Sequence, residues 1–201
     1  LNKVLVSDSS ILVGYLDRFY IYLSAESSAE VKDWFIESPF LETSPDIYNL
    51  QSLAEFLSTY QDQLLLITAM DDASNGLDES SHQALNSLGA NSSNIRFRGS
   101  YILICYRNKK VFEEYSEDRV LEFSFPSGSR TESLKWKKSI SLVSGGANSG
   151  SASSITLAGT ELSPKKRGIN IVVLSDDFNV LETAHFDTYE SSYRVLDPNI
   201  P

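Results

Sequence analysis

Near the first third of the chain, the sequence reads Leu64-Leu-Leu-Ile-Thr-Ala-Met70, which is apolar at odd and even positions alike. A short run of this kind is typical of a strand buried on both faces, because no side of it is left to water. Asp71-Asp72 follows directly. The sequence therefore predicts a strand in the middle of a sheet, with two carboxylates at its end.

Helical spacing is present on both sides of this strand. Before it, the apolar residues of 50–57 recur every three or four positions, as in an amphipathic helix. After it, Asp78 is suited to cap a second helix, which Gly89 closes. Strands at 95–97 and 101–106 then complete an order of helix, strand, helix, strand.

The rest of the chain is rich in β-branched residues and predicts short strands joined by turns. They lie at 4–6, 11–13, 19–23, 30–36, 120–125, 155–157, 168–174 and 180–186. The Gly/Ser-rich run 144–154 predicts a flexible or tightly turning loop. The expected fold class is α/β or α+β, a central mixed sheet flanked by helices, with an additional β-rich module.

Composition and charge exclude several classes of protein. The 17 Lys and Arg against 27 Asp and Glu give a net charge of -10, which repels phosphate backbones and anionic lipids. No apolar stretch approaches the roughly 20 residues that span a bilayer. The single cysteine, Cys105, lies in a predicted core strand and forms no intrachain disulfide, which suits a reducing cytoplasm. We therefore expect neither nucleic acid nor a membrane as partner, while protein partners, including a second copy, stay open.

Two separated stretches carry motifs of one domain family. The first begins with Arg167-Gly-Ile-Asn170 and ends with Phe186-Asp-Thr-Tyr189. The second runs from Leu53-Ala-Glu-Phe-Leu57 through the strand at 64–70 to Phe97-Arg-Gly-Ser-Tyr101. Together they resemble the ILEI/PANDER domain family, named after interleukin-like EMT inducer and pancreatic-derived factor.

The two stretches stand in the reverse of the family's order, which leaves two layouts open. In a tandem layout, 1–112 is one module with a degenerate first half, 113–138 is a linker or edge strand, and 139–201 is the front half of a second module. In a permuted layout, 139–201 completes the first module. The tandem layout is preferred, because 18–23 and 167–174 both have an Arg followed by alternating aliphatic residues.

Candidate ligand-binding residues lie at the end of the central strand and among the N-terminal aromatics. Asp71 and Asp72 occupy the edge of the expected parallel sheet, and paired carboxylates suit a divalent cation or sugar hydroxyls. The alternative is that they cap the following loop. Tyr20, Tyr22 and Trp34 suit contacts with a sugar or another chain, or else pack in the core.

No catalytic constellation is assembled in the sequence. His185 and Asp187 alternate onto one face of a strand without a nucleophile of known motif. The glycines of 145–150 lack the Gly-Lys-Ser/Thr ending of a phosphate loop. We therefore expect no enzyme activity, no cofactor and no metal centre.

The resemblance implies packing roles for Phe97 and Tyr101, and three candidate functions. Because the cysteines of secreted animal members are absent, the chain looks more like relatives in the long tail fibres of contractile-tailed phages. The first candidate is thus a structural connector of a virion tail fibre or similar assembly, built in the host cytoplasm and binding other virion proteins. The second is a lectin-like, carbohydrate-binding module. The third is a secreted, cytokine-like signalling protein.

Overall fold

The computed structural model describes residues 2–7, 10–15, 18–21, 49–132 and 134–196, with side chains for 50–132 and 134–194. Contacts divide the chain into two units, Leu1–Gln51 with Val195–Pro201, and Ser52–Arg194. The predicted strand at 30–36 lies outside the described residues, as do Tyr22 and Trp34. No helix of the described ranges is both long and apolar enough to cross a membrane.

The first unit contains a three-stranded antiparallel sheet with the order β1-β2-β3. Its strands are β1 (Asn2–Ser7), β2 (Ser10–Tyr15) and β3 (Arg18–Ile21). The strands predicted at 4–6 and 11–13 are confirmed, as is the beginning of the one at 19–23.

The second unit is built on a nine-stranded mixed sheet with the order β11-β10-β9-β5-β12-β13, extended by β6 and β7 beside β5 and by β8 beside β9. The strands are β5 (Leu64–Asp71), β6 (Ser100–Tyr106), β7 (Lys109–Ser116), β8 (Leu121–Phe125), β9 (Ile140–Gly146), β10 (Ala152–Leu157), β11 (Thr160–Glu161), β12 (Gly168–Leu174) and β13 (Val180–Phe186). A separate two-stranded sheet pairs β4 (Asn49–Ser52) with β14 (Tyr193–Leu196). The central place predicted for 64–70 is confirmed.

The expectation of a parallel sheet edge at Asp71 and Asp72 is wrong for most of β5. This strand is antiparallel to both β12 and β6. It is parallel only to the end of β9, where Met70 pairs with Gly145 and Asp71 with Gly146. The two carboxylates therefore follow a strand whose main partners run the opposite way.

The helices of this unit are α2 (Leu53–Thr59) and α3 (Glu79–Ser87), with short 3-10 turns η1 (Ser92–Asn94) and η2 (Ala147–Ser149). Ser52 caps α2 in a capping box with Glu55, so the helix cannot begin at residue 50 as expected, and 49–52 form β4 instead. Asp78 caps α3 as predicted, accepting a hydrogen bond of 2.8 Å from the Ser81 N–H. Gly89 follows with φ +82°, the left-handed conformation that ends a helix.

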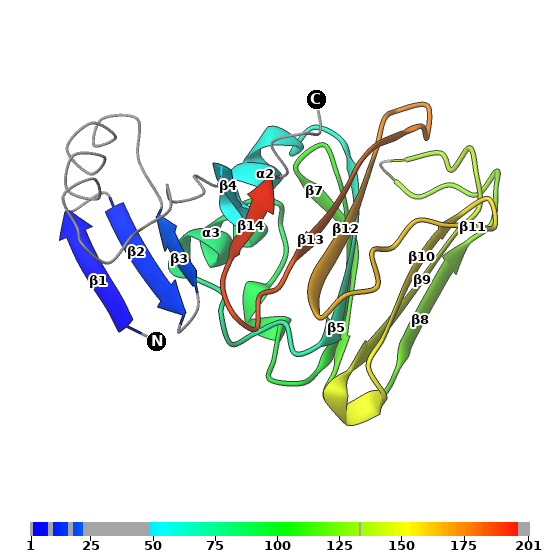
Figure 1. Cartoon of the computed structure of the whole chain (residues 1–201). Coiled ribbons are helices and arrows are strands. Elements are labelled where there is room, and N and C mark those ends of the chain that lie inside the picture. The colour runs from blue at the N-terminus through cyan, green and yellow to red at the C-terminus, as the bar shows by residue number, and fades with distance from the viewer. Residues whose placement is uncertain (1, 8–9, 16–17, 22–48, 133, 197–201) are drawn as a thin grey trace. The chain divides into compact units, whose positions relative to one another are not determined.

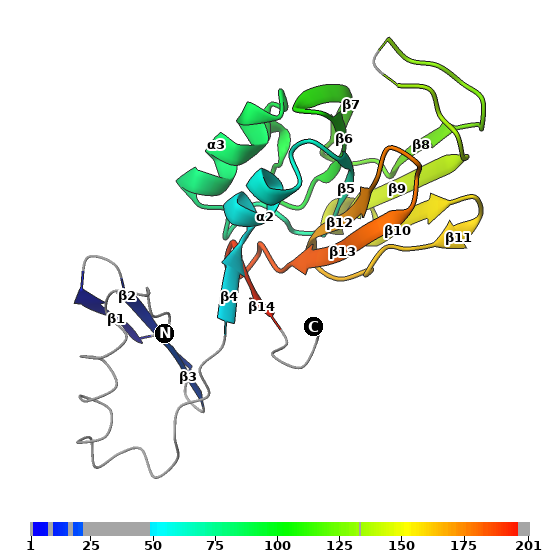
Figure 2. The ribbon, with the colours of Figure 1, turned by 90° about the horizontal axis from the view of Figure 1, so that it is seen from above.

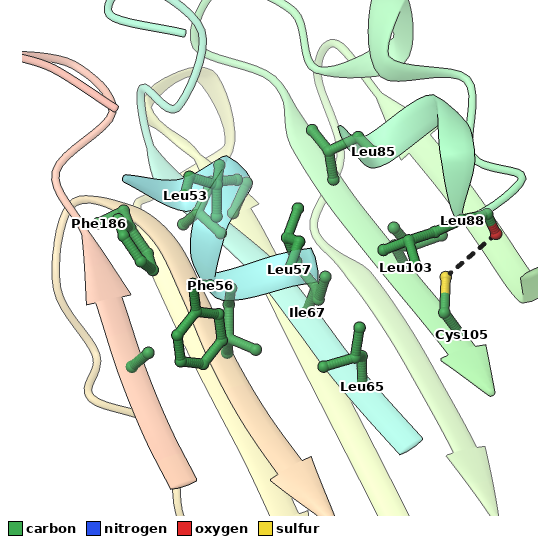
Figure 3. Packing of buried hydrophobic residues seen from close by; sticks show 14 of the residues in the cluster. Leu53, Phe56, Leu57, Leu65, Ile67, Leu85, Leu88, Leu103, Cys105 and Phe186 are labelled. Carbon is green, nitrogen blue, oxygen red and sulfur yellow. Dashed lines mark hydrogen bonds between the residues drawn. The ribbon is translucent and has the colours of Figure 1, made fainter. Parts of the chain in front are cut away.

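The core has two sides because successive residues of β5 face opposite layers. Leu65, Ile67 and Ala69 pack with α2 and α3, whereas Leu64 and Leu66 pack with residues of β8, β9 and β10. Figure 1 shows these layers, with α2 and α3 on one side of β5 and β12 and the β8 to β11 strands on the other. The side chains between helices and sheet are shown in Figure 3. The described structure is therefore mainly β-sheet, with helices on one face of the central strands rather than on both.

One local expectation is right only in part and one is wrong. The Gly/Ser-rich run 144–154 turns tightly at 147–151, but its ends belong to β9 and β10, which pair as a hairpin, and the buried Ser144 hydroxyl donates to the Ala69 carbonyl (2.6 Å) and accepts from the Tyr101 N–H (2.9 Å). Residues 95–97 form no strand, since they follow η1 in a turn before β6.

Both stretches that resemble the family lie in one sheet. β12 pairs with β5 along its whole length, from Gly168 opposite Met70 to Leu174 opposite Leu64. Figure 2 shows β12 alongside β5, with β13 on the other side of β12. The predicted boundaries at 112 and 138 concern how the chain divides into family modules, and they stay a prediction.

Candidate functional site

Strained backbone gathers where β5 ends. Asp71, Arg98 and Ser151 have φ values of 61°, 56° and 50°, in the left-handed region that residues other than glycine rarely adopt. Such strain persists only where the surroundings enforce it, and it is frequent at functional sites. All three residues contact Gly146 or pair with it, so one end of the sheet holds them together.

Gly146 makes this convergence possible because it has no side chain. A Cβ there would overlap the Arg98 carbonyl oxygen and the Gly99 carbonyl carbon. The Gly146 N–H donates to Ser100 Oγ (3.0 Å), and the Asn148 N–H donates to the Arg98 carbonyl (3.3 Å). The turn before β6 is thus held directly against the end of β9.

Two charged side chains at this end have no partner among the described residues. The Asp71 carboxylate is half-buried and the Arg98 guanidinium is exposed, and neither forms a hydrogen bond or ion pair with another described residue. Phe97 is 66% exposed, with the Arg98 guanidinium carbon 5.4 Å from its ring centroid. We name Asp71, Phe97, Arg98 and Gly146 the strand-end site.

The packing role expected for Phe97 is wrong, whereas that of Tyr101 is confirmed. Tyr101 is fully buried, and its hydroxyl donates to Glu113 (2.9 Å). Ile95 fills the core ahead of the turn, which leaves Phe97 on the surface. The signal that could have revealed this is Arg98-Gly99, because a charged residue and a glycine together favour an exposed turn.

The structure separates the two predicted carboxylates. Asp72 is only 2% exposed, and one of its oxygens accepts hydrogen bonds from the Ser74 N–H (2.9 Å) and hydroxyl (2.8 Å). This is the loop cap that the sequence left as an alternative, whereas Asp71 lies in the strand-end site. Tyr20 lies in β3 of the first unit, and Tyr22 and Trp34 lie outside the described residues, so a ligand role for these three stays a prediction.

His185 and Asp187 both hold Arg167. The His185 Nε2 lies 2.6 Å from the Arg167 carbonyl oxygen, and Asp187 receives two hydrogen bonds from the guanidinium (2.9 and 2.7 Å). Glu190 accepts a third (3.0 Å), and the ring of Tyr189 lies 4.5 Å from the guanidinium carbon. These contacts give His185 and Asp187 a structural role, because they fix Arg167 at the point where the chain enters β12.

Substituting His185 is expected to flatten the pH dependence of stability. Burial lowers the pKa of His185 below its ordinary 6.5, so as pH falls the unfolded chain takes up the proton first. The contribution to stability is complete above pH 6.5 and is lost as pH falls below it. Urea unfolding of wild type and His185→Gln between pH 7.5 and 5.5 measures this loss of stability. Glutamine is chosen because its amide keeps a donor for the Arg167 carbonyl. If the free energy of unfolding changed equally with pH in the two proteins, the argument from burial of His185 would be contradicted.

Cys105 is a buried thiol rather than an exposed one. Burial raises the pKa of the Cys105 thiol to about 12, and its sulfur faces the Leu88 carbonyl at 3.7 Å, as Figure 3 shows. Within 50–132 and 134–194, no three His, Cys, Asp or Glu side chains form a metal-binding group. The arrangement at the strand-end site is thus suited to hydrogen bonding and stacking.

Fold and site together define an α+β module on a mixed sheet, with a polar and aromatic surface where its central strand ends. The family model described as Interleukin-like EMT inducer (ILEI) matches residues 2–109, which is more than half of the chain. The chain therefore belongs to the ILEI/PANDER family, a family of cytokine-like or extracellular modules whose members are typically secreted. Neither the curated proteins nor the solved structures contain a match to it.

Proposed function

We propose that this chain is a non-enzymatic binding module whose strand-end site takes a neutral glycan. The observation that carries the proposal is that the backbones of Asp71 and Arg98 meet at Gly146, that neither side chain is hydrogen-bonded or ion-paired to another described residue, and that the exposed ring of Phe97 lies beside the Arg98 guanidinium. Sugar hydroxyls donate to a carboxylate and accept from a guanidinium, and an aromatic face covers the apolar side of a sugar ring. The net charge of -10 disfavours anionic glycans. The family's typical secretion supports an extracellular setting.

A glycan array followed by calorimetry on the full chain tests this proposal. We expect Asp71→Asn and Arg98→Asn each to weaken binding about tenfold or more, because each removes a hydrogen bond to a charged group. Asparagine tolerates the left-handed backbone of both positions, so the fold should survive. Arg130→Asn, at an exposed arginine outside the site, serves as the control and should bind as wild type does. Silence across neutral glycan classes, or unaltered affinity of both variants, would refute the proposal.

A second candidate is a structural connector that acts through protein contacts. Tyr115 and Val120 are 38% and 40% exposed, and the Arg96 guanidinium carbon lies 4.9 Å from the Tyr115 ring centroid. Exposed aromatic and arginine side chains favour protein interfaces. A virion tail fibre is the most specific form of this candidate. Cytokine-like signalling, the third candidate, rests on the family alone.

Co-expression with the products of neighbouring genes tests the connector. We expect a stable complex that Tyr115→Ser with Val120→Ser dissociates, while glycan binding is unchanged. A chain that stays monomeric beside every neighbour would rule the connector out.

A further inference from the structure

Asn75-Gly76 is the one Asn-Gly pair in the chain, and it lies in the loop between β5 and α3 with Asn75 exposed. Such a pair cyclises readily, by attack of the glycine nitrogen on the asparagine side-chain amide, because glycine has no Cβ to hinder the approach. The Leu77 N–H donates to the Ser74 carbonyl (3.3 Å), so the pair is at the centre of a tight turn. This loop therefore carries an amide that is chemically labile.

The turn after β13 holds both reacting groups of the pair. The Gly76 N–H donates to the Thr188 carbonyl (2.5 Å), and Asn75 Nδ2 donates to the Tyr189 carbonyl (2.9 Å). The buried Ser192 hydroxyl donates to the Gly76 carbonyl (2.8 Å). We name Asn75, Gly76, Thr188, Tyr189 and Ser192 the clasp, because they join the loop to the turn.

The clasp requires glycine at position 76. A Cβ on Gly76 would lie 2.7 Å from the Ser191 nitrogen and 2.8 Å from both the Glu190 carbonyl carbon and the Thr188 carbonyl oxygen. These are main-chain atoms, which cannot rotate away as a flexible side chain would. The close contact that demands glycine is thus the same contact that covers the labile pair.

Cyclisation needs the hydrogen bonds of the pair to open. The Gly76 nitrogen must lose its proton and bond to Asn75 Cγ, while the side-chain nitrogen takes up a proton and leaves as ammonia. Water then adds to either carbonyl of the succinimide ring and opens it to an aspartate or an isoaspartate at position 75. Because Gly76 is bonded to Thr188 and the Asn75 amide to Tyr189, the reaction proceeds only in molecules whose clasp has opened.

Neither product can close the clasp again. Both replace the amide, which donates to the Tyr189 carbonyl, with a carboxylate, which only accepts. An isoaspartate also lengthens the main chain by one methylene next to Gly76, where even a Cβ has no room. A transient opening thus becomes a permanent one.

We infer that Asn75 is a latent deamidation site, kept unreactive by the clasp, whose reaction permanently releases the turn 187–192 from the loop after β5. This turn contains Asp187 and Glu190, the carboxylates that hold Arg167 at 2.7 and 3.0 Å. Its release loosens the chain where it enters β12. No clasp residue belongs to the strand-end site, so the inference does not depend on glycan binding.

Storage of the full chain in neutral buffer tests whether the clasp protects Asn75. Peptide mass spectrometry and labelling by an isoaspartate methyltransferase measure the deamidation rate in the native chain and in the urea-unfolded chain. We expect the native rate to be at least about tenfold slower, because two hydrogen bonds of the pair must open first. Equal rates would overturn the inference.

Ser192→Ala separates opening of the clasp from unfolding of the whole unit. Alanine removes the hydrogen bonds of Oγ with the Gly76 carbonyl and the Asp78 N–H (2.9 Å), so we expect deamidation about three- to tenfold faster than in wild type. Ile155→Val is the matched control, because it removes a buried methyl group from the core cluster on the other side of β5 and does not touch the clasp. It should leave the rate unchanged. If both variants accelerated deamidation equally, the reaction would proceed through global unfolding and the inference would be wrong.

Asn75→Asp reproduces one product of the reaction and tests its consequence. We expect hydrogen–deuterium exchange in the peptide covering 187–192 to be about three- to tenfold faster than in wild type, because the donor to the Tyr189 carbonyl is lost. Asn179→Asp adds the same charge at an exposed asparagine outside the clasp and should leave this exchange unchanged. Exchange at the wild-type rate in Asn75→Asp would also overturn the inference.

Discussion

Gly146→Ala is expected to destabilise the unit Ser52–Arg194 by about 3 kcal/mol, at the upper end of the usual cost of overpacking. The backbone of Gly146 has φ -69° and ψ 173°, which alanine adopts without strain. The cost comes from the added Cβ, which would overlap main-chain atoms of Arg98 and Gly99 that cannot rotate away. Urea unfolding measures the change, and loss of glycan binding should accompany it because Arg98 is displaced.

Gly150→Ala is the matched control for this prediction. Gly150 has φ +103° and nothing within 4 Å of an added Cβ, so only its backbone strain counts, at about 1 kcal/mol. If both alanine variants unfolded at the same urea concentration, the close contact between β9 and the turn before β6 would not exist.

Trp136→Ala is expected to destabilise the same unit by about 3–5 kcal/mol. Trp136 is fully buried between β8 and the turn before β13, stacked on Phe125 at 4.8 Å between ring centroids and edge-on to Phe178 at 5.9 Å. Removing the indole leaves a cavity that these rings cannot collapse to fill. Equilibrium unfolding in urea measures the loss.

Lys135→Ala controls for changes in the same segment. Lys135 is exposed beside Trp136, and its substitution is expected to change stability by less than about 0.5 kcal/mol. If Trp136→Ala were equally harmless, the segment 113–138 would behave as a linker, one of the two roles that the sequence suggested for it.

Local patterns were sufficient to predict much of the fold. The unbroken apolar run 64–70 identified the central strand, since a strand covered on both faces needs no alternation. Asp78 and Gly89 identified α3 by capping its two ends, an effect of the nearest residues alone. The strands 168–174 and 180–186 were predicted with the bounds that the structure has.

The candidate site was only partly accessible to the same reasoning. Asp71 was singled out correctly as a residue at the end of a central strand, but its distance from Arg98 depends on β9, which lies far along the chain. Phe97 was assigned to the core because its apolar character was visible while the turn that exposes it was not. The Gly/Ser-rich run predicts a flexible or tightly turning loop, whereas the pairing of β9 with β10 confines the turn to 147–151.

By itself, the sequence determined the central strand 64–70, the strands 168–174 and 180–186 and the capped ends of α3, because side-chain periodicity and helix caps act over a few residues. Only the tertiary structure decided that β12 lies against β5, that the backbones of Asp71 and Arg98 meet at Gly146, and that Asp72 is buried while Phe97 is exposed. Those outcomes depend on which of several similar strands pair and in what register. The pairing is determined by packing among segments far apart in the chain, for which no local pattern carries a signal.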